Sequence, residues 1–284
     1  MRFSKLQATG NDFILIDART PGVIPSEAQD LAKLARDLCR HHFGIGADGL
    51  ILVQDSELAD VKMRVLNPDG SEAEACGNGL RCFVKYVIEN GIVDRIDLNI
   101  ETLAGMRRAK ARMSGEQVSE VQVSMGMPQF KPEEIPINAQ VDITPILDYP
   151  LAIGERTLAL SILSMGNPHA VGFLSQPVAG FPLADVGPKV EGYPMFPHRT
   201  NFEIARVLSN GKIEARVWER GVGETLACGS GACAIAVAAQ LLDYAGSEVD
   251  ITFPGGGVTV VWDGVGEVLL SGPVEEIFTG ESRT

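Results

Sequence analysis

Basic residues are scarce in this chain. Its 284 residues include 24 Lys and Arg against 37 Asp and Glu, which gives a formal net charge of −13. Nucleic acids and anionic membranes are bound through clustered Lys and Arg, so the composition argues against both as partners. We expect the partner to be a small molecule. With 45% hydrophobic residues, the chain otherwise has the composition of a globular protein of one large or two medium domains.

Long apolar runs are also absent. The longest, at residues 232–242, is too short to span a bilayer and contains Gln240. Residues 1–12 carry no apolar run of the kind that a secretory signal requires. We therefore expect a cytoplasmic protein that does not insert into a membrane.

Cysteine is sparse as well. The chain has five cysteines, an odd number that fits reduced thiols better than a disulfide framework. Cys76 and Cys82 are too far apart in sequence for the usual pair of zinc ligands, and no pair of histidines follows Cys228 and Cys233. We therefore expect no metal site. Cys39, Cys82 and Cys233 are best interpreted as packing residues.

The two remaining cysteines lie in nearly identical sequences. Ala-Cys-Gly-Asn-Gly at 75–79 recurs 152 positions later as Ala-Cys-Gly-Ser-Gly at 227–231. The same 152-residue shift aligns two further identities, Arg64 with Arg216 and Glu72 with Glu224. A weaker echo pairs Thr-Gly-Asn at 9–11 with Met-Gly-Asn at 165–167. The period far exceeds the roughly 20–50 residues of solenoid repeats, so we infer two domains of similar fold.

Short apolar runs bounded by Gly, Pro, Asn and Asp predict that strands dominate. Such runs occur at residues 13–16, 50–53, 61–66, 96–100, 118–123, 158–163, 213–218 and 258–262. Only three segments have helical patterns: 26–39 with Ser26 as N-cap, 80–89, and 232–242, which is apolar nearly all round. The fold class is therefore α+β, with mostly antiparallel sheets.

Proline-rich segments suggest how the chain is divided. Residues 125–146 show no sustained periodicity, and we place the domain boundary there, with an N-terminal domain at 1–124 and a C-terminal domain at 125–272. Residues 273–284 are expected to return to the first domain. A second irregular stretch, at 176–200, is interpreted as a surface loop or a small excursion of the C-terminal domain.

The chemistry points to Cys76 and Cys228. Each is predicted to start a core helix, where free N–H groups and the helix dipole can lower a thiol pKa from about 8.5 to roughly 3.5–7.5. The neighbouring glycines let the backbone approach an anion such as a carboxylate closely. A thiolate and a thiol on opposite faces of one carbon can remove a proton and return one from the other side, which inverts the stereocentre. The pattern therefore predicts two-base racemase or epimerase chemistry.

Six ordered blocks resemble the diaminopimelate epimerase family and spread over essentially the whole chain. They are Gly-Asn-Asp-Phe at 10–13, Asn-Pro-Asp-Gly-Ser-Glu at 67–72, Cys-Gly-Asn-Gly-Leu-Arg-Cys at 76–82, Met-Gly-Asn-Pro-His at 165–169, Glu-Arg-Gly-Val-Gly-Glu-Thr at 219–225 and Ala-Cys-Gly-Ser-Gly-Ala-Cys at 227–233. The resemblance implies a cofactor-independent enzyme that interconverts LL- and meso-2,6-diaminopimelate, in lysine and peptidoglycan precursor biosynthesis. It also implies two pseudo-symmetric domains, each a sheet curled around a central helix, with the active site in the cleft between them, and it suggests a homodimer.

The resemblance also implies residue roles. Cys76 and Cys228 become the acid and base, with Cys228 removing the proton from the LL isomer, and His169 and Glu219 tune the thiols. The implied substrate-binding residues are Asn11, Asn67, Gly77, Asn78, Asn167, Asn201, Glu219, Arg220, Gly229 and Ser230. Among these, Gly77 with Asn78 and Gly229 with Ser230 would hold the reacting carboxylate. Arg220 would bind the distant carboxylate by forked hydrogen bonds.

One departure and two alternatives accompany this interpretation. Gly49 stands where some family members carry a substrate-contacting glutamine, so that contact is not expected here. A proline or hydroxyproline-type cysteine-pair racemase is one alternative, although its typical Ser-Pro-Cys-Gly-Thr differs from Leu-Ala-Cys-Gly-Ser at 226–230. A non-catalytic two-lobed amino-acid-binding protein is the other, although it would not need two thiols. His169 alone could simply cap a turn.

Overall fold

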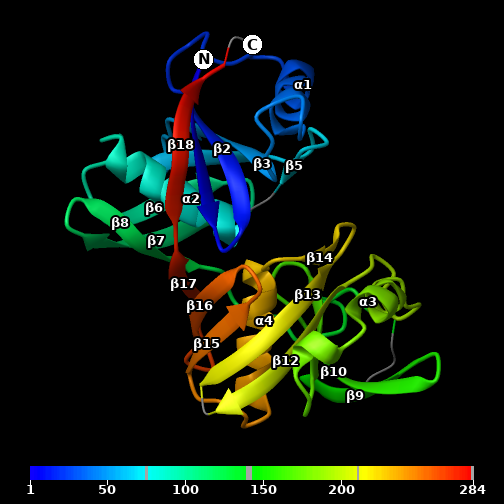
Figure 1. Ribbon diagram of the computed structural model, residues 1–284. Coiled ribbons are helices and arrows are strands. Elements are labelled where there is room, and N and C mark those ends of the chain that lie inside the picture. Colours follow the sequence, from blue (N-terminus) through cyan, green and yellow to red (C-terminus); the bar gives the residue numbers. More distant parts are fainter. Residues whose placement is uncertain (74–75, 139–142, 210, 283–284) are drawn as a thin grey trace. The chain divides into compact units, whose positions relative to one another are not determined.

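A computed structural model describes residues 1–73, 76–138, 143–209 and 211–282 of the chain. The chain forms two compact units: residues 1–124 with 271–284 make unit 1, and residues 125–270 make unit 2 (Figure 1). Ala75 of the first cysteine motif and positions 139–142 of the predicted boundary segment lie outside the described residues. Among the residues described, no helix combines the length and apolar character that crossing a membrane would need.

Unit 1 is a sheet whose neighbouring strands are mostly antiparallel. In spatial order its strands are β18 (Glu275–Glu281), β1 (Arg2–Ala8), β2 (Asn11–Asp17), β3 (Gly49–Gln54), β4 (Val61–Leu66), β6 (Asp97–Thr102), β7 (Gly105–Ser114) and β8 (Gln117–Ser124). The pairs β2/β3 and β4/β6 are parallel, and the short β5 (Glu72–Ala73) pairs with β4. Helix α1 (Ala28–Cys39) connects β2 to β3, and α2 (Gly77–Glu89) connects β5 to β6.

Unit 2 repeats most of this arrangement. Its spatial order is β9 (Ile146–Ile153), β10 (Arg156–Ser164), β11 (Pro168–Phe173), β12 (Asn201–Ser209), β13 (Lys212–Glu219), β15 (Glu248–Phe253) and β16 (Gly256–Val261). The parallel pairs are β11/β12 and β13/β15, and the short β14 (Gly223–Thr225) pairs with β13. A 3-10 turn, η1 (Val178–Gly180), and α3 (Leu183–Glu191) connect β11 to β12, and α4 (Gly229–Leu241) connects β14 to β15. Strand β17 (Leu269–Pro273) leads the chain back to unit 1.

One helix lies at the centre of each sheet. Helix α2 packs against β1, β2, β3, β7 and β8, and α4 packs against β10, β11, β12, β15 and β16 (Figure 1). Residues 77–87 of α2 and 231–239 of α4 are buried, because strands surround each helix. An apolar helix enclosed on all sides withdraws its whole side-chain surface from water, which is the main stabilising term of such a core. The predicted α+β class, with a sheet curled around a central helix in each of two pseudo-symmetric domains, is confirmed.

The helix boundaries differ from those predicted. Helix α1 begins at Ala28 after Glu27, which makes no side-chain capping bond, rather than after Ser26, because the carbonyl of Glu27 accepts the first helical bonds from Asp30 and Leu31. Helices α2 and α4 each begin three residues before the predicted starts at 80 and 232. The glycines that weakened the apolar pattern are therefore the first residues of both helices.

Helix α3 falls within residues 176–200, so the surface-loop alternative predicted for this stretch is wrong. Pro188 inside the helix hid the pattern, yet Leu183, Val186 and Val190 form a buried stripe. A parallel pair such as β11/β12 needs a long crossover, and α1 supplies the equivalent crossover in unit 1. The internal duplication was therefore the signal that could have predicted a helix here.

Candidate active site

Both predicted cysteines cap their helices in the same geometry. Cys76 precedes α2 with φ −137° and ψ 120°, and Cys228 precedes α4 with φ −130° and ψ 123°. The Cys76 sulfur accepts the backbone N–H of Gly79 at 3.5 Å, and the Cys228 sulfur accepts that of Gly231 at 3.4 Å. Each thiol thus takes the capping position that Ser or Asp commonly occupies, at the positive end of a helix dipole.

The second glycine of each motif makes room for the strand beneath the helix. A Cβ on Gly79 would lie 3.2 Å from Ile51 Cδ1, whereas a Cβ on Gly231 would lie 2.8 Å from Glu203 Oε1. The sequence predicted that these glycines serve close approach of a ligand. The structure shows that a Cβ at either position would crowd the strand beneath, against an apolar side chain in unit 1 and a carboxylate in unit 2.

In unit 1 the side chains around Cys76 hold one another in fixed orientations. The Asn11 amide donates to Asp48 Oδ2 at 2.6 Å, which turns its Oδ1 toward Cys76, 3.8 Å from the sulfur. The same Oδ1 accepts from the Asn78 amide at 3.4 Å. Arg81, fully buried, donates to Asn78 Oδ1 at 2.7 Å. The Cys76 thiol therefore faces an acceptor whose orientation is set by Asp48 and Arg81.

Asn67 has a different setting. It follows β4 in a turn, where its amide donates to Ser71 Oγ at 2.9 Å and its backbone N–H bonds to the Ser71 carbonyl. Within the described part of unit 1, no hydrogen bond joins Asn67 to the side chains around Cys76. The structure thus brings Asn11, Asn78 and Cys76 together and leaves Asn67 outside that group.

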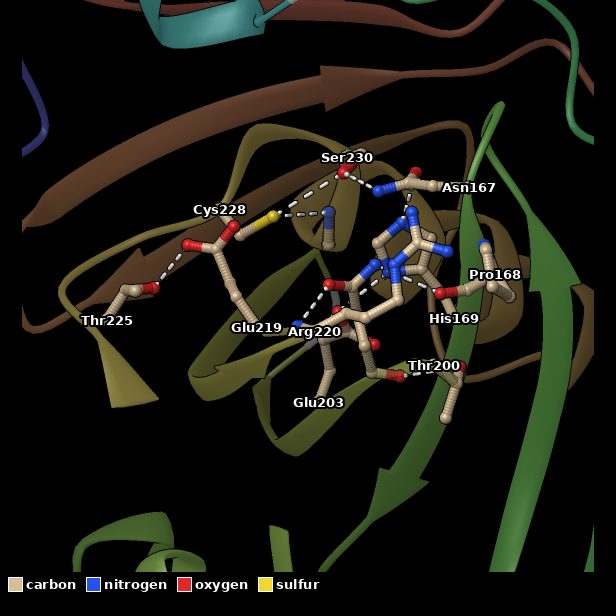
Figure 2. A network of polar contacts seen from close by, with 12 residues as sticks. Asn167, Pro168, His169, Thr200, Glu203, Glu219, Arg220, Thr225, Cys228 and Ser230 are labelled. Atoms are coloured by element: carbon tan, nitrogen blue, oxygen red, sulfur yellow. Dashed lines mark hydrogen bonds and ion pairs between the residues drawn. The ribbon is translucent and has the colours of Figure 1, made fainter. Parts of the chain in front are cut away.

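In unit 2, Cys228 is buried beside two carboxylates (Figure 2). Burial raises the pKa of the Cys228 thiol well above its ordinary value, and the negative charges of Glu219 and Glu203 raise it further. The Ser230 hydroxyl, 3.4 Å from the sulfur, and the Gly231 N–H act in the opposite direction but are outweighed. The predicted lowering of the thiol pKa is therefore wrong for Cys228, because burial and neighbouring anions outweigh the helix N-terminus.

Glu219 lies at the end of β13 and is itself perturbed. Burial raises the pKa of its carboxyl, while hydrogen bonds with Thr225 and Cys228 oppose that rise. The Thr225 hydroxyl donates to Glu219 Oε1 at 2.5 Å and holds the carboxylate in place (Figure 2). Glu219 thus lies beside the Cys228 thiol with a raised pKa, and its role as a tuning residue stays a prediction.

A chain of polar side chains links Cys228 to the interior of unit 2. Ser230 Oγ accepts from the Asn167 amide at 3.5 Å, and Asn167 Oδ1 lies 2.9 Å from His169 Nε2. His169 Nδ1 lies 2.7 Å from Glu203 Oε1, and neither of these two side chains is exposed. In the described structure His169 therefore reaches the thiol through Asn167 and Ser230 rather than by direct contact (Figure 2).

Asn201 and Arg220 form a second group in unit 2. The buried Asn201 amide donates to the Pro168 carbonyl at 3.0 Å and accepts the Arg220 backbone N–H at 2.9 Å. The exposed Arg220 guanidinium bonds the His198 carbonyl at 3.2 Å. Asn201 thus fixes the backbone that carries Arg220, whose remaining guanidinium donors are at the surface.

Sequence reasoning did not assign four polar residues of these clusters to the site: Asp48, Arg81, Glu203 and Thr225. Glu203 could have been found, because it is a carboxylate between the apolar residues Phe202 and Ile204 of β12, and charged residues are almost never fully buried unless paired. Arg81 carried no such signal, since a helical arginine is ordinarily solvated.

The remaining cysteines and the repeated glutamates are structural. All five cysteines are free thiols, and burial raises the pKa of Cys39 to about 12. Glu72 pairs with Arg64 and Glu224 with Arg216 through two hydrogen bonds each, at 2.8–3.0 Å. The described residues include no group of three or more His, Cys, Asp or Glu side chains that could hold a metal ion.

Solved structures identify the class of fold. The chain resembles a phenazine biosynthesis protein of the PhzF family from Bacillus anthracis, with a TM-score of 0.70, 16% identity and coverage of 100% of this chain and 99% of that one. It also resembles a hydroxyproline epimerase from Agrobacterium vitis, with a TM-score of 0.69, 15% identity and coverage of 99% and 91%. The protein therefore has the duplicated α+β fold of these proteins, with a cysteine capping the central helix of each unit.

Sequence comparison gives the family. The diaminopimelate epimerase model matches residues 3–131 and 161–277. Diaminopimelate epimerase of Moorella thermoacetica is 45% identical over 282 residues, and that of Pelotomaculum thermopropionicum is 44% identical over 281 residues; the alignments cover 99% of this chain and 99% and 98% of those proteins. The chain belongs to the diaminopimelate epimerase family.

Proposed function

We propose that this protein interconverts LL-2,6-diaminopimelate and meso-2,6-diaminopimelate by a two-base mechanism that needs no cofactor. The observation that carries the proposal is the pair of helix-capping thiols, Cys76 and Cys228, on a duplicated scaffold. Family membership at 45% identity over essentially the whole chain supplies the substrate.

The reaction requires removal of the α-proton beside a carboxylate, and a helix N-terminus suits that step. Backbone N–H groups at Gly77–Asn78 and Gly229–Ser230 would bind the carboxylate and stabilise the negative charge that develops as the proton leaves. The Cys228 thiolate takes the α-proton of the LL isomer, and the Cys76 thiol delivers its proton to the opposite face to give the meso isomer. The reverse reaction exchanges the two roles.

The other predicted site residues are assigned to the part of the substrate that does not react. A second amino-acid group presents a carboxylate and an ammonium, which call for a guanidinium and for amide or carboxylate oxygens, respectively. Arg220 would bind the carboxylate, and Asn11, Asn67, Asn167, Asn201 and Glu219 would supply the remaining polar contacts. His169 acts on Cys228 through the side chains between them.

The test is an isotope experiment in D₂O with the reduced protein and LL-diaminopimelate, without pyridoxal phosphate. We expect meso-diaminopimelate to form with deuterium at the inverted α-carbon. Failure of both epimerisation and exchange would overturn the proposal. Exchange into L-proline or hydroxyproline instead would select a racemase of that type, and binding of diaminopimelate without exchange would select a binding protein.

A homodimer and a cytoplasmic location are parts of this proposal that rest on the family resemblance and on the lack of long apolar runs. Light scattering during size-exclusion chromatography measures the mass directly. A particle of twice 30.4 kDa supports the dimer, and a 30.4 kDa particle contradicts it.

A further inference from the structure

The buried floor beneath the two active-site helices differs between the units. The 152-residue shift aligns Ile51 with Glu203, and the echo of Gly-Asn at 10–11 with Gly-Asn at 166–167 aligns Leu15 with Val171. The strand registers agree with both alignments, because Leu15 lies opposite Ile51 and Val171 lies opposite Glu203. The neighbours two positions earlier are Phe13 in unit 1 and His169 in unit 2. Phe13 and Ile51 are 3% and 0% exposed, and His169 and Glu203 are both 0% exposed. A buried apolar pair in unit 1 is thus replaced by a buried histidine–carboxylate pair in unit 2.

Packing alone does not explain this replacement. A buried ion pair is often no more stabilising than apolar residues of similar size, because desolvation offsets the attraction. Unit 1 fills the equivalent space with Phe13 and Ile51. Glu203 Oε2 is buried without a hydrogen-bond partner among the described residues, which adds a further cost. A group kept in so unfavourable a setting is a candidate for a functional role.

The hydrogen bonds of His169 show its orientation. Each ring nitrogen lies against an oxygen, Glu203 Oε1 at 2.7 Å and Asn167 Oδ1 at 2.9 Å. A ring with N–H groups on both nitrogens satisfies both oxygens, and the Glu203 carboxylate balances its charge. The Asn167 oxygen then accepts from His169, so its NH₂ group faces Ser230.

This orientation continues to the thiol. Ser230 Oγ accepts from Asn167, which leaves the hydroxyl hydrogen free to donate to the Cys228 sulfur 3.4 Å away. A hydroxyl that donates to sulfur stabilises the thiolate over the thiol. The chain Glu203–His169–Asn167–Ser230 thus ends on Cys228 as a donor.

We propose that Glu203 is a positioning residue for the proton chemistry of Cys228. Glu203 acts through His169 and Asn167 to point the Ser230 hydroxyl at the Cys228 sulfur. The inference deepens the proposed function, since it concerns how the base of that reaction is prepared. Loss of the carboxylate removes the counter-ion of His169. A neutral imidazole can donate from either nitrogen, so the direction of the chain is no longer fixed.

A direct effect of Glu203 on Cys228 has the opposite sign, which makes the inference testable. As a charge acting through space, Glu203 raises the pKa of the thiol, as does Glu219 on β13. The other titratable group on this side is His169 on β11, and the first turn of α4 carries no acidic residue. If only the through-space charge mattered, removing it would make Cys228 more reactive. If the hydrogen bonds from Glu203 through His169, Asn167 and Ser230 matter more, removing Glu203 makes Cys228 less reactive.

The experiment measures alkylation of each cysteine by iodoacetamide from pH 6 to 10, with mass spectrometry to separate Cys76 from Cys228. In Glu203→Gln we expect the midpoint for Cys228 to rise by about one pH unit, which slows alkylation about tenfold at pH 8. Cys76 serves as the internal control and should keep its profile. Glu203→Asp retains the carboxylate and should restore part of the rate.

A second set of variants, made in Ser230→Ala, removes the hydroxyl that ends this series of hydrogen bonds. In Ser230→Ala the rise caused by Glu203→Gln should disappear, because the carboxylate then acts on the sulfur only through space. A midpoint in Glu203→Gln that falls or stays unchanged, or a rise that persists in Ser230→Ala, would overturn the inference. Neither readout uses turnover, so a protein that fails to epimerise diaminopimelate would sink the proposed function while leaving this test intact.

A double variant separates function from folding. His169→Phe with Glu203→Ile copies the pair that unit 1 uses at the same place. We expect its thermal unfolding midpoint to match or exceed that of the wild type, while Cys228 alkylation slows as in Glu203→Gln. Normal reactivity of Cys228 in this folded double variant would show that the pair has a packing role alone.

Discussion

The two cysteines occupy equivalent places in the duplicated scaffold, yet their polar neighbours offer opposite hydrogen-bonding groups. Cys76 faces Asn11 Oδ1, an acceptor that favours the thiol, because Asp48 holds the Asn11 amide turned away. Cys228 faces the hydroxyl of Ser230, which is available as a donor and favours the thiolate. The backbone thus supplies two equal thiols, and side chains distinguish them. The donor thus lies at the thiol that we propose as the base toward the LL isomer, where it opposes the burial and the negative charges that favour the protonated form.

The buried charges are also distributed unequally. Unit 1 buries the cation Arg81 where the repeat places Cys233 in unit 2, and unit 2 buries the anion Glu203 where unit 1 has Ile51. Arg81 orients Asn78, and Glu203 anchors His169. A charge in an interior is tolerated only when it is paired or hydrogen-bonded, so each unit holds its charge in a network that ends near its own thiol.

Removal of either thiol should produce the largest effect. We expect Cys76→Ser and Cys228→Ser each to lower the epimerisation rate by about 10³-fold, because each removes one of two proton-transfer groups. Conversion of LL-diaminopimelate measures this, with Cys39→Ala as the control for loss of a packing thiol that retains the wild-type rate. A single variant with undiminished activity would show that one thiol serves both faces and that the comparison of two roles is mistaken.

Glu219→Gln tests how the negative charge beside Cys228 affects that thiol. Because the Glu219 carboxylate raises the pKa of the Cys228 thiol, its removal increases the thiolate fraction, and we expect Cys228 alkylation at pH 8 to accelerate about three- to tenfold. Epimerisation should still fall, since the proposed contact of Glu219 with the substrate is lost. Slower or unchanged alkylation would contradict this effect of the Glu219 carboxylate on the Cys228 thiol.

The same variant has a pH signature in stability. The raised pKa of Glu219 means that the folded protein holds this proton more tightly than the unfolded chain does, so wild-type stability declines as pH rises above the ordinary value of 4.5. Glu219→Gln removes the titrating carboxyl and, with it, this pH-dependent contribution to the free energy of unfolding. Urea unfolding at pH 4 and pH 8 should therefore show the variant gaining stability relative to the wild type at the higher pH, and an equal difference at both would contradict the assignment.

Asp48→Asn should make the surroundings of Cys76 in unit 1 more like those of Cys228. Without the Asp48 carboxylate, the Asn11 amide can rotate and present its NH₂ group to Cys76, which exchanges an acceptor for a donor. A net hydrogen-bond difference of about 1 kcal/mol corresponds to roughly a fivefold faster alkylation of Cys76, with Cys228 unchanged. An unchanged Cys76 would indicate that Asn78 alone holds Asn11 in place.

The repeated surface ion pairs should give the smallest effects. Glu72→Gln and Glu224→Gln each disrupt an equivalent bidentate pair with arginine, and we expect each to lower the unfolding free energy by less than about 1 kcal/mol. Arg216 also donates to the Val178 and Phe181 carbonyls at 2.9 Å, so Arg216→Met should exceed Arg64→Met by about 1–2 kcal/mol in urea unfolding. Equal losses would show that these carbonyls find water instead.

Much of the fold could be predicted because the relevant signals are local or repeated. The apolar alternation of β4 predicted its bounds, 61–66, without error. Helix α3 was missed because its short apolar stripe is interrupted by Pro188, and only its place as the crossover between two parallel strands explains it. The start of α1 was displaced because a serine that could cap a helix does not do so when the backbone turns one residue later.

The candidate site divides in the same way. The sequence by itself determined two thiols at helix N-termini, because Cys-Gly-X-Gly acts within one helical turn and the duplication repeats it. Only the tertiary structure decided what each thiol faces. Asn11 lies 65 residues before Cys76, and Glu203 reaches His169 across 34 residues through a pair of parallel strands. Hydrogen-bond direction and burial depend on such distant partners, so the raised pKa of Cys228 and the opposite neighbours of the two sulfurs could be established only in the folded chain.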